Sequence, residues 1–432
     1  MVNIERWDWT SEHKMLADTT KWKDQFEDVW EPYISPDGEK IASIVKVGEG
    51  EFNICVNGNT WEESFEKMWY SRFSPDGRLT ALVSKDMEWT MAVDGAALEE
   101  TYEYIWDTKF SANGKVIAAA VKKDDAYFVL VNGKAWECST VSVNGKTLEC
   151  STVLQSIASH AVSPDGNTVA AIAQTAPLGQ ADLEGFLNGT WSVVVNGKPW
   201  EKNFVDVYGL AVSNDDKNVA AEYRAAICEY GIVVNGTPWN EKYGCTWEPV
   251  FNPVNSDEIT TPVKQGSQWF LATNGRIVWD RGFVNLLYQT YSPDGQKIAA
   301  TVAPQFGKWT VAVDGQPWPI TFGECVLMPC FSQDSRKLAV IAKDSGNWLL
   351  VVDGTVLGES YDNIWQPVFN DDDVICKVEK NGKYAVAVNG KIRGKDYEAL
   401  WNPVVSPDGT KVMICGVEGG KYYRNIIPIG DL

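Results

Sequence analysis

Short apolar runs alternate with polar turns along the whole chain, and the pattern repeats about every 40 residues. Strict alternation or short β-branched runs indicate strands, and helical periodicity is nearly absent. In one repeat an alternating stretch (70–73) is followed by a turn (74–77), two apolar runs (79–83 and 89–93), a second turn (94–95) and a short last segment (100–105). The pattern predicts four antiparallel strands per repeat, which is the composition of a propeller blade.

Two turn signals punctuate each repeat. In a Ser-Pro-Asp-Gly tetrapeptide, proline presets φ, aspartate bonds nearby backbone and glycine accepts a positive φ, so the tetrapeptide predicts a tight turn. The second signal, Asn-Gly or Asp-Gly, favours a two-residue hairpin. The tetrapeptide is intact at Ser35, Ser74, Ser163, Ser292 and Ser406 and degenerate at Ser111, Ser213, Asn252, Ser332 and Asn370.

The repeat count predicts an all-β fold: a β-propeller of about ten four-stranded antiparallel blades in a single domain, residues 1–432. Residues 1–29 precede the first tetrapeptide, and the tenth repeat stops after its third strand. We therefore expect the N-terminal segment, residues 1–29, to add the fourth strand of the last blade and close the ring, which would remove an exposed edge. Two five-bladed rings are the alternative.

Two irregular places interrupt the repeat. Residues 129–140 are nearly copied by residues 141–152, which predicts an added hairpin within an inserted loop at residues 136–157. A second inserted loop, apolar and glycine-containing, is predicted at residues 174–190. In a repeat protein an inserted loop is either a binding site or an insertion that the fold tolerates without a function. Both interpretations remain open here.

The twenty tryptophans follow the repeat. Some stand five residues before the second turn and others just after it, so most are expected to pack between blades. A third group begins the first strand of a blade, near one rim, where Trp and Tyr would be favoured interface anchors. The candidate partner-binding residues are Trp30, Trp69, Trp106, Trp247, Trp365, Trp401 and Tyr208.

Composition narrows the classes of function. The net charge of −20 disfavours nucleic acid and anionic membrane surfaces as partners. The N-terminus shows no secretory signal, no apolar stretch is long enough to span a membrane, and nine scattered cysteines fit a reducing compartment. We expect a cytoplasmic protein or, through partner subunits, one peripheral to the inner membrane.

Motifs for catalysis and for cofactors are missing. The chain has no Cys-x-x-Cys, no Gly-x-Ser-x-Gly and no phosphate-binding loop, and it has only two histidines, His13 and His160. We therefore predict no catalytic residue, no cofactor and no metal. His160, at the start of a first strand, is a candidate for a working group in the central channel, although a lone histidine is more often structural.

The tetrapeptide, the apolar strand after it and the Trp-rich corner resemble the WD40-like repeats of the TolB type across nearly the whole chain. With its length and its tryptophan content, the chain is more specifically similar to the tryptophan-rich subunit of the Tmc transmembrane electron-transport complex of sulfate-reducing bacteria. The resemblance implies an accessory subunit beside an iron-sulfur protein and a membrane cytochrome, and it implies no catalytic residues.

These observations predict a non-catalytic scaffold or interaction subunit, an accessory component of a membrane-associated electron-transport complex. The alternative is a propeller enzyme or small-ligand binder that uses the central channel, with His160 or channel carboxylates as working groups.

Overall fold

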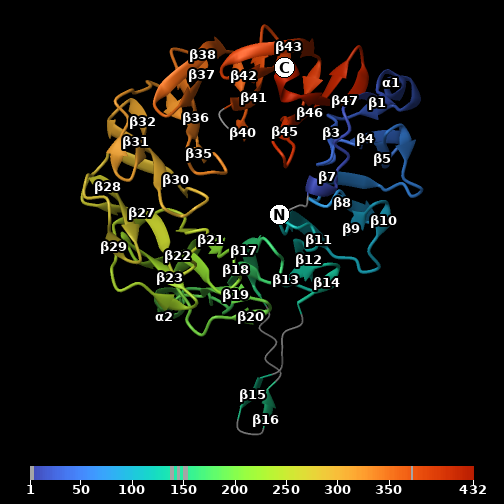
Figure 1. The fold of residues 1–432 in the computed structure, drawn as a ribbon. Helices are drawn as coiled ribbons and strands as arrows, with labels where there is room; N and C mark the ends of the chain where they lie inside the picture. Colours follow the sequence, from blue (N-terminus) through green and yellow to red (C-terminus); the bar gives the residue numbers. More distant parts are fainter. Residues whose placement is uncertain (1–3, 137–140, 144–145, 149–153, 371–372) are drawn as a thin grey trace. The chain divides into compact units, whose positions relative to one another are not determined.

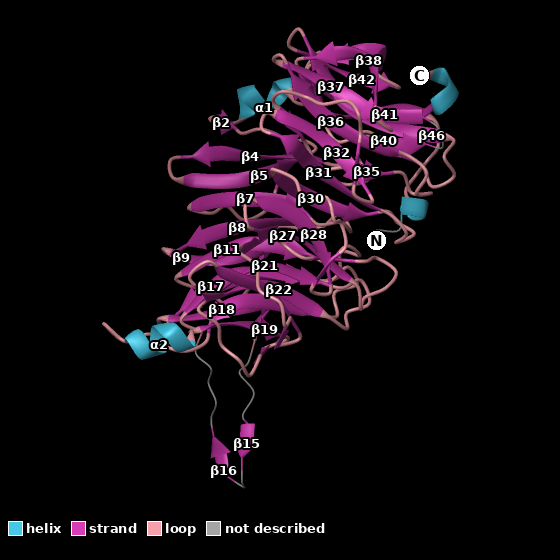
Figure 2. Ribbon diagram, turned by 90° about the vertical axis from the view of Figure 1, so that its left-hand side faces the viewer, coloured by secondary structure: helices cyan, strands magenta, loops and turns pink. Residues whose placement is uncertain are grey.

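The fold is a β-propeller of ten blades, as the sequence predicts. A computed structural model describes residues 4–136, 141–143, 146–148, 154–370 and 373–432. Strands make up almost all of the regular secondary structure, and the helices are short (Figure 2). The blades fall into two compact units, Phe65–Val278 and Asn3–Ser64 with Trp279–Leu432, which are described in turn.

The first unit contains blades 2 to 6. Its strands are β7 (Lys67–Phe73), β8 (Leu79–Lys85), β9 (Glu88–Val93) and β10 (Ala96–Ala97); β11 (Tyr104–Phe110), β12 (Ile117–Lys123), β13 (Ala126–Val131) and β14 (Lys134–Ala135); β17 (Ser156–Val162), β18 (Val169–Gln174), β19 (Trp191–Val195) and β20 (Lys198–Pro199); β21 (Asp206–Val212), β22 (Val219–Ala226), β23 (Glu229–Val234) and β24 (Thr237–Pro238); and β25 (Cys245–Thr246), β26 (Val250–Phe251), β27 (Ile259–Gln265), β28 (Gln268–Thr273) and β29 (Arg276–Ile277).

The second unit contains blade 1 and blades 7 to 10. Its strands are β2 (Asp28–Val29), β3 (Tyr33–Ile34), β4 (Ile41–Gly48), β5 (Glu51–Val56) and β6 (Asn59–Thr60); β30 (Asn285–Tyr291), β31 (Ile298–Gln305), β32 (Lys308–Val313) and β33 (Gln316–Pro317); β34 (Cys325–Val326), β35 (Cys330–Phe331), β36 (Leu338–Asp344), β37 (Asn347–Val352) and β38 (Thr355–Tyr361); β39 (Asn363–Ile364), β40 (Val368–Asn370), β41 (Asp373–Lys380), β42 (Lys383–Val388) and β43 (Lys391–Tyr397); and β44 (Ala399–Leu400), β45 (Val404–Val405), β46 (Lys411–Glu418), β47 (Lys421–Pro428) and β1 (Glu12–Asp18).

The N-terminal strand completes the last blade, which confirms the predicted closure. Strand β1 pairs antiparallel with β47 from Glu12↔Ile426 to Asp18↔Lys421, and Figure 1 shows β1, in blue, beside β47, in red. The helix α1 (Thr20–Gln25) follows β1 and leads into blade 1. Blade 1 belongs to the same compact unit as blades 7 to 10.

The tetrapeptide forms the turn between the first and second strands. In blade 2 the Gly77 amide donates to the Ser74 carbonyl at 2.9 Å, and Gly77 has φ +84°. The Ser74 hydroxyl bonds the Asp76 carboxylate and accepts the Arg78 amide at 3.0 Å. The serine and aspartate side chains therefore make hydrogen bonds within the turn itself, which is why this sequence recurs at the same place in the repeat.

The first strand of every blade is interrupted in its middle. In blades 1, 6, 8, 9 and 10 a proline splits the strand in two, because proline has no N–H to donate to the ladder; these prolines are Pro32, Pro249, Pro329, Pro367 and Pro403. In blades 2, 3, 4, 5 and 7 the strand keeps its length and a β-bulge shifts the register instead. In four of these bulges a residue has positive φ: Tyr70, Asp107, Gly209 and Tyr288.

The core lies between the faces of successive blades. One cluster joins Ile172 and Val193 of blade 4 to Val207 and Tyr223 of blade 5, all buried. Outside this layer, the tryptophan after the second turn of one blade packs on the turn glycine of the next. A Cβ at Gly236 would meet the Trp200 indole at 3.4 Å, and one at Gly354 would meet Trp318 at 3.3 Å. Tryptophan and glycine thus act together as an inter-blade contact.

The two predicted insertions differ in how much of them is described. In the first, β15 (Val141–Val143) pairs antiparallel with β16 (Lys146–Leu148), and residues 137–140, 144–145 and 149–153 lie outside the described residues. The second contains a helix, α2 (Leu183–Asn188), whose start is capped by the Asp182 carboxylate, which accepts the Gly185 amide at 2.8 Å.

Candidate functional site

The seven residues predicted to bind a partner all lie on or beside the first strands, and they differ in exposure. Trp30, Trp69, Trp247 and Tyr208 are exposed, with 45%, 38%, 43% and 38% of their surface accessible. Trp106, Trp365 and Trp401 are half-buried. Because every other tryptophan is buried or half-buried, the three exposed tryptophans all belong to the predicted first-strand group.

The structure connects two of the seven, Trp69 in blade 2 and Trp106 in blade 3, through Tyr104. Trp69 on β7 lies 6.3 Å from Tyr104 on β11, and Tyr104 lies 5.7 Å from Trp106, as ring centroids. Trp89 on β9 is also 6.3 Å from both Trp69 and Tyr104. We call Trp69, Trp89 and Tyr104 the blade-2 aromatic cluster.

Sequence reasoning missed Tyr104 as a member of this cluster. A signal was present, because Tyr104 stands two residues before Trp106 and the side chains of a strand alternate between its faces. Tyr104 is 44% exposed, so the cluster presents aromatic surface from two blades to solvent.

The other predicted tryptophans each contact an aromatic residue of their own blade. Trp30 lies 5.8 Å from Phe52, Trp247 stacks on Trp269 at 5.3 Å with an interplanar angle of 7°, and Trp365 meets Tyr384 edge-on at 5.7 Å. In blade 10, Trp401 lies 5.6 Å from Tyr422. Each first-strand tryptophan is therefore supported by a ring on the third strand.

Tyr208 differs from the tryptophans because its phenol is tied to a carboxylate. Its hydroxyl donates to Asp206 at 2.5 Å, and burial together with this carboxylate raises the pKa of Tyr208. Across the ladder Tyr208 pairs with Glu222 on β22. Glu222 is 8% exposed, and burial raises its pKa to about 7. A carboxyl that titrates close to neutral pH is thus the cross-strand neighbour of the exposed Tyr208.

His160 is a buried residue of β17, not an exposed one. It is 1% exposed, and neither ring nitrogen has a hydrogen-bond partner. Its Nδ1 lies 3.6 Å from Asp107 Oδ2 on β11. Burial lowers the pKa of His160 to about 4, although the Asp107 charge opposes this change. At neutral pH the imidazole is uncharged.

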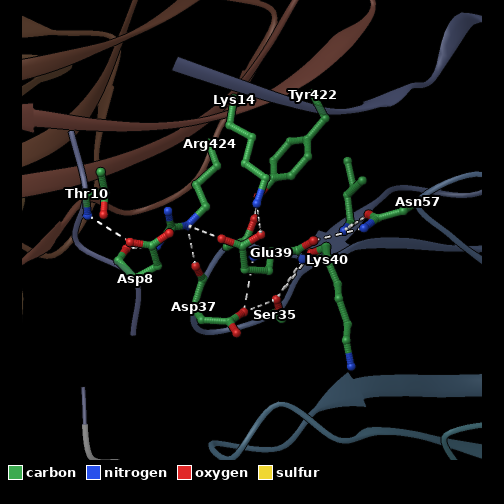
Figure 3. Close-up of polar contacts among 12 residues, drawn as sticks. Asp8, Thr10, Lys14, Ser35, Asp37, Glu39, Lys40, Asn57, Tyr422 and Arg424 are labelled. Atoms are coloured by element: carbon green, nitrogen blue, oxygen red, sulfur yellow. Dashed lines mark hydrogen bonds and ion pairs between the residues drawn. The ribbon is translucent and has the colours of Figure 1, made fainter. Parts of the chain in front are cut away.

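A network around Arg424 joins the N-terminal segment, blade 1 and blade 10 (Figure 3). Arg424 is 1% exposed and lies 3.2 Å from Glu39. Its guanidinium donates to the carbonyls of Asp37 and Asp8 at 2.8 and 2.5 Å. Lys14 on β1 pairs with the same Glu39 at 2.8 Å. These bonds hold the closing blade against blade 1 and leave the guanidinium no access to solvent.

A cleft of about 320 Å³ lies beside β1 and β47 in the second unit. His13 lines it, but its ring is occupied: Nδ1 bonds the Asn425 side chain and the imidazole stacks on Tyr423 at 4.4 Å. Within the described residues, no group of three or more His, Cys, Asp or Glu side chains has the spacing of a metal site. In the same residues, no helix is long and apolar enough to span a bilayer.

The strand topology defines a β-propeller fold. No protein-family model and no curated protein matches it. Among solved structures, it is similar to the crystal structure of the eukaryotic initiation factor, with 13% identity, 92% of each chain covered and a TM-score of 0.41. It is also similar to the β-propeller domain of Myceliophteria thermophila Cps50 (Swd1), with 11% identity, 62% and 95% covered and a TM-score of 0.31. These values are low, so the fold assignment rests on the strand topology.

Proposed function

We propose that this protein is a non-catalytic interaction subunit that binds another protein through the exposed first-strand aromatic residues. The observation that carries the proposal is that Trp30, Trp69 and Trp247 are the exposed tryptophans of the chain and occupy one position of the repeat. Indole surface left in water is costly, and it is favourable to bury it in an interface.

The partner that we propose is a subunit of a membrane-bound electron-transport complex, an iron-sulfur protein or a membrane cytochrome. The motivation is the Trp-rich repeat, which resembles that of the tryptophan-rich Tmc subunit, together with a sequence that has none of the usual cofactor motifs. The net charge of −20 favours a partner with a basic surface and disfavours nucleic acid. In this role the propeller supplies a rigid surface and the partner supplies the redox centre.

The test is affinity purification of the tagged chain from membranes of its source, followed by identification of what elutes with it. We expect redox subunits to elute with the wild-type chain and to be lost with a Trp30→Ala, Trp69→Ala, Trp247→Ala triple variant. Val254→Ala is the control, because Val254 is an apolar side chain, 65% exposed, in the turn between β26 and β27 and not on a first strand. Equal recovery with the triple variant would refute the aromatic surface, and recovery of the chain alone would refute the complex.

The second candidate function is small-ligand binding or catalysis near His160. The observation that favours it is a buried imidazole with both nitrogens unpartnered beside Asp107. If His160 were a working group, His160→Gln would abolish ligand-dependent stabilisation in a thermal-shift screen. If the residue is structural, the variant would change the melting temperature equally with and without every compound in the screen.

A further inference from the structure

The blade-2 aromatic cluster has an unusual arrangement of its three rings. The centroids of Trp69, Trp89 and Tyr104 are each 6.3 Å from the other two. Trp89 stands nearly perpendicular to both of its neighbours, at 74° and 76°, whereas Trp69 and Tyr104 are tilted by 33°. Three rings in contact, two of them over a third exposed, combine negative ring faces in one small area.

In other blades the matching rings carry a lysine of this chain. Lys264 lies 5.9 Å from the Trp269 ring in blade 6, and Lys343 lies 5.3 Å from the Trp348 ring in blade 8. In blade 9, Lys377 lies 4.0 Å from Trp365 and 4.5 Å from Tyr384. A cation over the ring is therefore a recurrent feature of this position, and it is favourable because the ring face is electron-rich.

In blades 6 and 8 the lysine comes from the same place in the ladder, whereas in blade 9 that place holds Glu379, the partner of Tyr384, and Lys377 stands two residues earlier. Lys264 and Lys343 are the direct cross-strand partners of Trp269 and Trp348. Blades 1, 3 and 5 also have a basic residue at this place: Lys46, Lys122 and Arg224. In blade 2 the partner of Trp89 is Ser84, which is small and buried. Blade 2 therefore has no basic residue at this place, as is also the case in blades 4, 9 and 10, where Gln174, Glu379 and Val417 occupy it.

Two basic residues of β7 flank Trp69: Lys67 stands two residues before it, and Arg72, three residues after it, already contacts other groups. Arg72 on β7 lies over Tyr70 and Phe110, at 5.2 and 5.6 Å, and bonds the Thr108 carbonyl at 2.9 Å. Two carboxylates are sequence neighbours of the cluster: Glu88 precedes Trp89, and Glu103, which pairs with Lys122 at 2.8 Å, precedes Tyr104. Glu88 is exposed, so it adds negative potential to the surface of this blade.

We propose that the blade-2 aromatic cluster binds a cationic side chain, lysine or arginine, of the partner protein. This inference rests on the proposed function, and it specifies the chemistry by which the partner is recognised. The partner's cation would take the place that Lys264 and Lys343 take in blades 6 and 8. An arginine would use the site best, since its flat guanidinium can stack on an indole while it bonds a carboxylate.

The test uses the full chain labelled with 5-fluorotryptophan and followed by ¹⁹F NMR, with resonances assigned from Trp69→Phe and Trp89→Phe variants. The probe is Nα-acetyl-arginine methylamide, and the matched neutral probe is the citrulline analogue. We expect saturable shifts at Trp69 and Trp89 with arginine that are absent with citrulline and weaken with added salt. Tyr104→Ala should weaken arginine binding about tenfold. Equal responses to the two probes, or none to arginine, would overturn the proposal.

A second variant tests the comparison between blades. Lys377→Met removes the ammonium from the Trp365 and Tyr384 rings of blade 9, so we expect arginine to shift the Trp365 resonance in this variant and not in the wild-type chain. If the Trp365 resonance responds to arginine in neither protein, the site that Lys377 occupies is not a cation site. The comparison between blades then fails, and the proposal with it.

The outcomes separate this inference from the proposed function. If redox subunits elute with the wild-type chain but the rings ignore arginine, the interaction subunit stands and its cation site is refuted. If the rings bind arginine but no subunit elutes with the chain, the site stands and the proposed complex is refuted.

Discussion

The side-chain carbonyl of Asn57 accepts a hydrogen bond from the backbone N–H of Ile41 at 2.8 Å, which ties the second turn of blade 1 to the start of its second strand. The Asn57 amide in turn donates to the Glu39 carbonyl at 2.9 Å, and Asn57 has φ +49°. The same acceptor bond recurs in blades 2 to 9, through Asp94, Asn132, Asn196, Asn235, Asn274, Asp314, Asp353 and Asn389.

We predict that Asn57→Ala lowers the free energy of unfolding by about 2 to 3 kcal/mol. The variant leaves the Ile41 amide and the Glu39 carbonyl without their partner and places alanine at a positive φ that it tolerates poorly. Urea denaturation followed by tryptophan fluorescence measures the change.

Asn57→Asp is the control for this variant. It keeps the acceptor and a residue type that the turns of blades 2, 7 and 8 already use, so it should cost less than about 1 kcal/mol. Equal losses for the two variants would show that the side-chain acceptor contributes nothing.

The sequence was sufficient for the blade and its turns because each turn depends on neighbouring residues. Asp94 and Gly95 make a hairpin by their own φ angles, whatever lies around them. The bond from the Leu79 amide to Asp94, at 2.9 Å, spans fifteen residues, so no local rule reveals it. The same limit applies to the first strands that a proline splits. The proline is visible in the sequence, but the split depends on the strand that pairs with the first strand.

The candidate site was predictable only in part, for the same reason. The periodic placement of Trp69 and Trp247 marked them as a group, and their exposure agrees with a place near a rim. The repeat could not show that Trp69 lies beside Tyr104, because Tyr104 belongs to the next blade. Nor could it show that Arg424 reaches Asp8, since 416 residues separate them.

Arg424 gives the second prediction. Arg424→Ala should lower the free energy of unfolding by about 3 to 5 kcal/mol, because it leaves two backbone carbonyls without their buried donor and removes one of the two cations that pair with Glu39. Differential scanning calorimetry measures the loss. Arg424→Lys keeps the charge but loses the planar fork, so it should recover only part of the stability. Full recovery with lysine would contradict a role for the guanidinium geometry.

The tryptophans give the third prediction, which separates packing from binding. Trp269 is 7% exposed and Trp69 is 38% exposed. Trp269→Ala should therefore cost about 3 to 5 kcal/mol in unfolding free energy, as for a buried large aromatic, and Trp69→Ala clearly less. Chemical denaturation of the two variants under one set of conditions tests this order. A reversed order would mean that Trp69 is the packing residue and would remove the reason to treat it as a binding residue.

Glu222 gives a prediction about pH. Burial raises the pKa of its carboxyl from 4.5 to about 7 in the folded chain, so the folded state holds this proton more tightly than the unfolded state does. Stability from this group is therefore fully present below pH 4.5 and is lost as pH rises toward 7, by up to about 3 kcal/mol. Glu222→Gln removes the titration and keeps the shape. We expect the difference in unfolding free energy between the variant and the wild-type chain to be larger at pH 8 than at pH 5, in favour of glutamine. If this difference is the same at the two pH values, the carboxyl is already charged in the folded chain. Water would then reach the carboxyl although Glu222 is only 8% exposed.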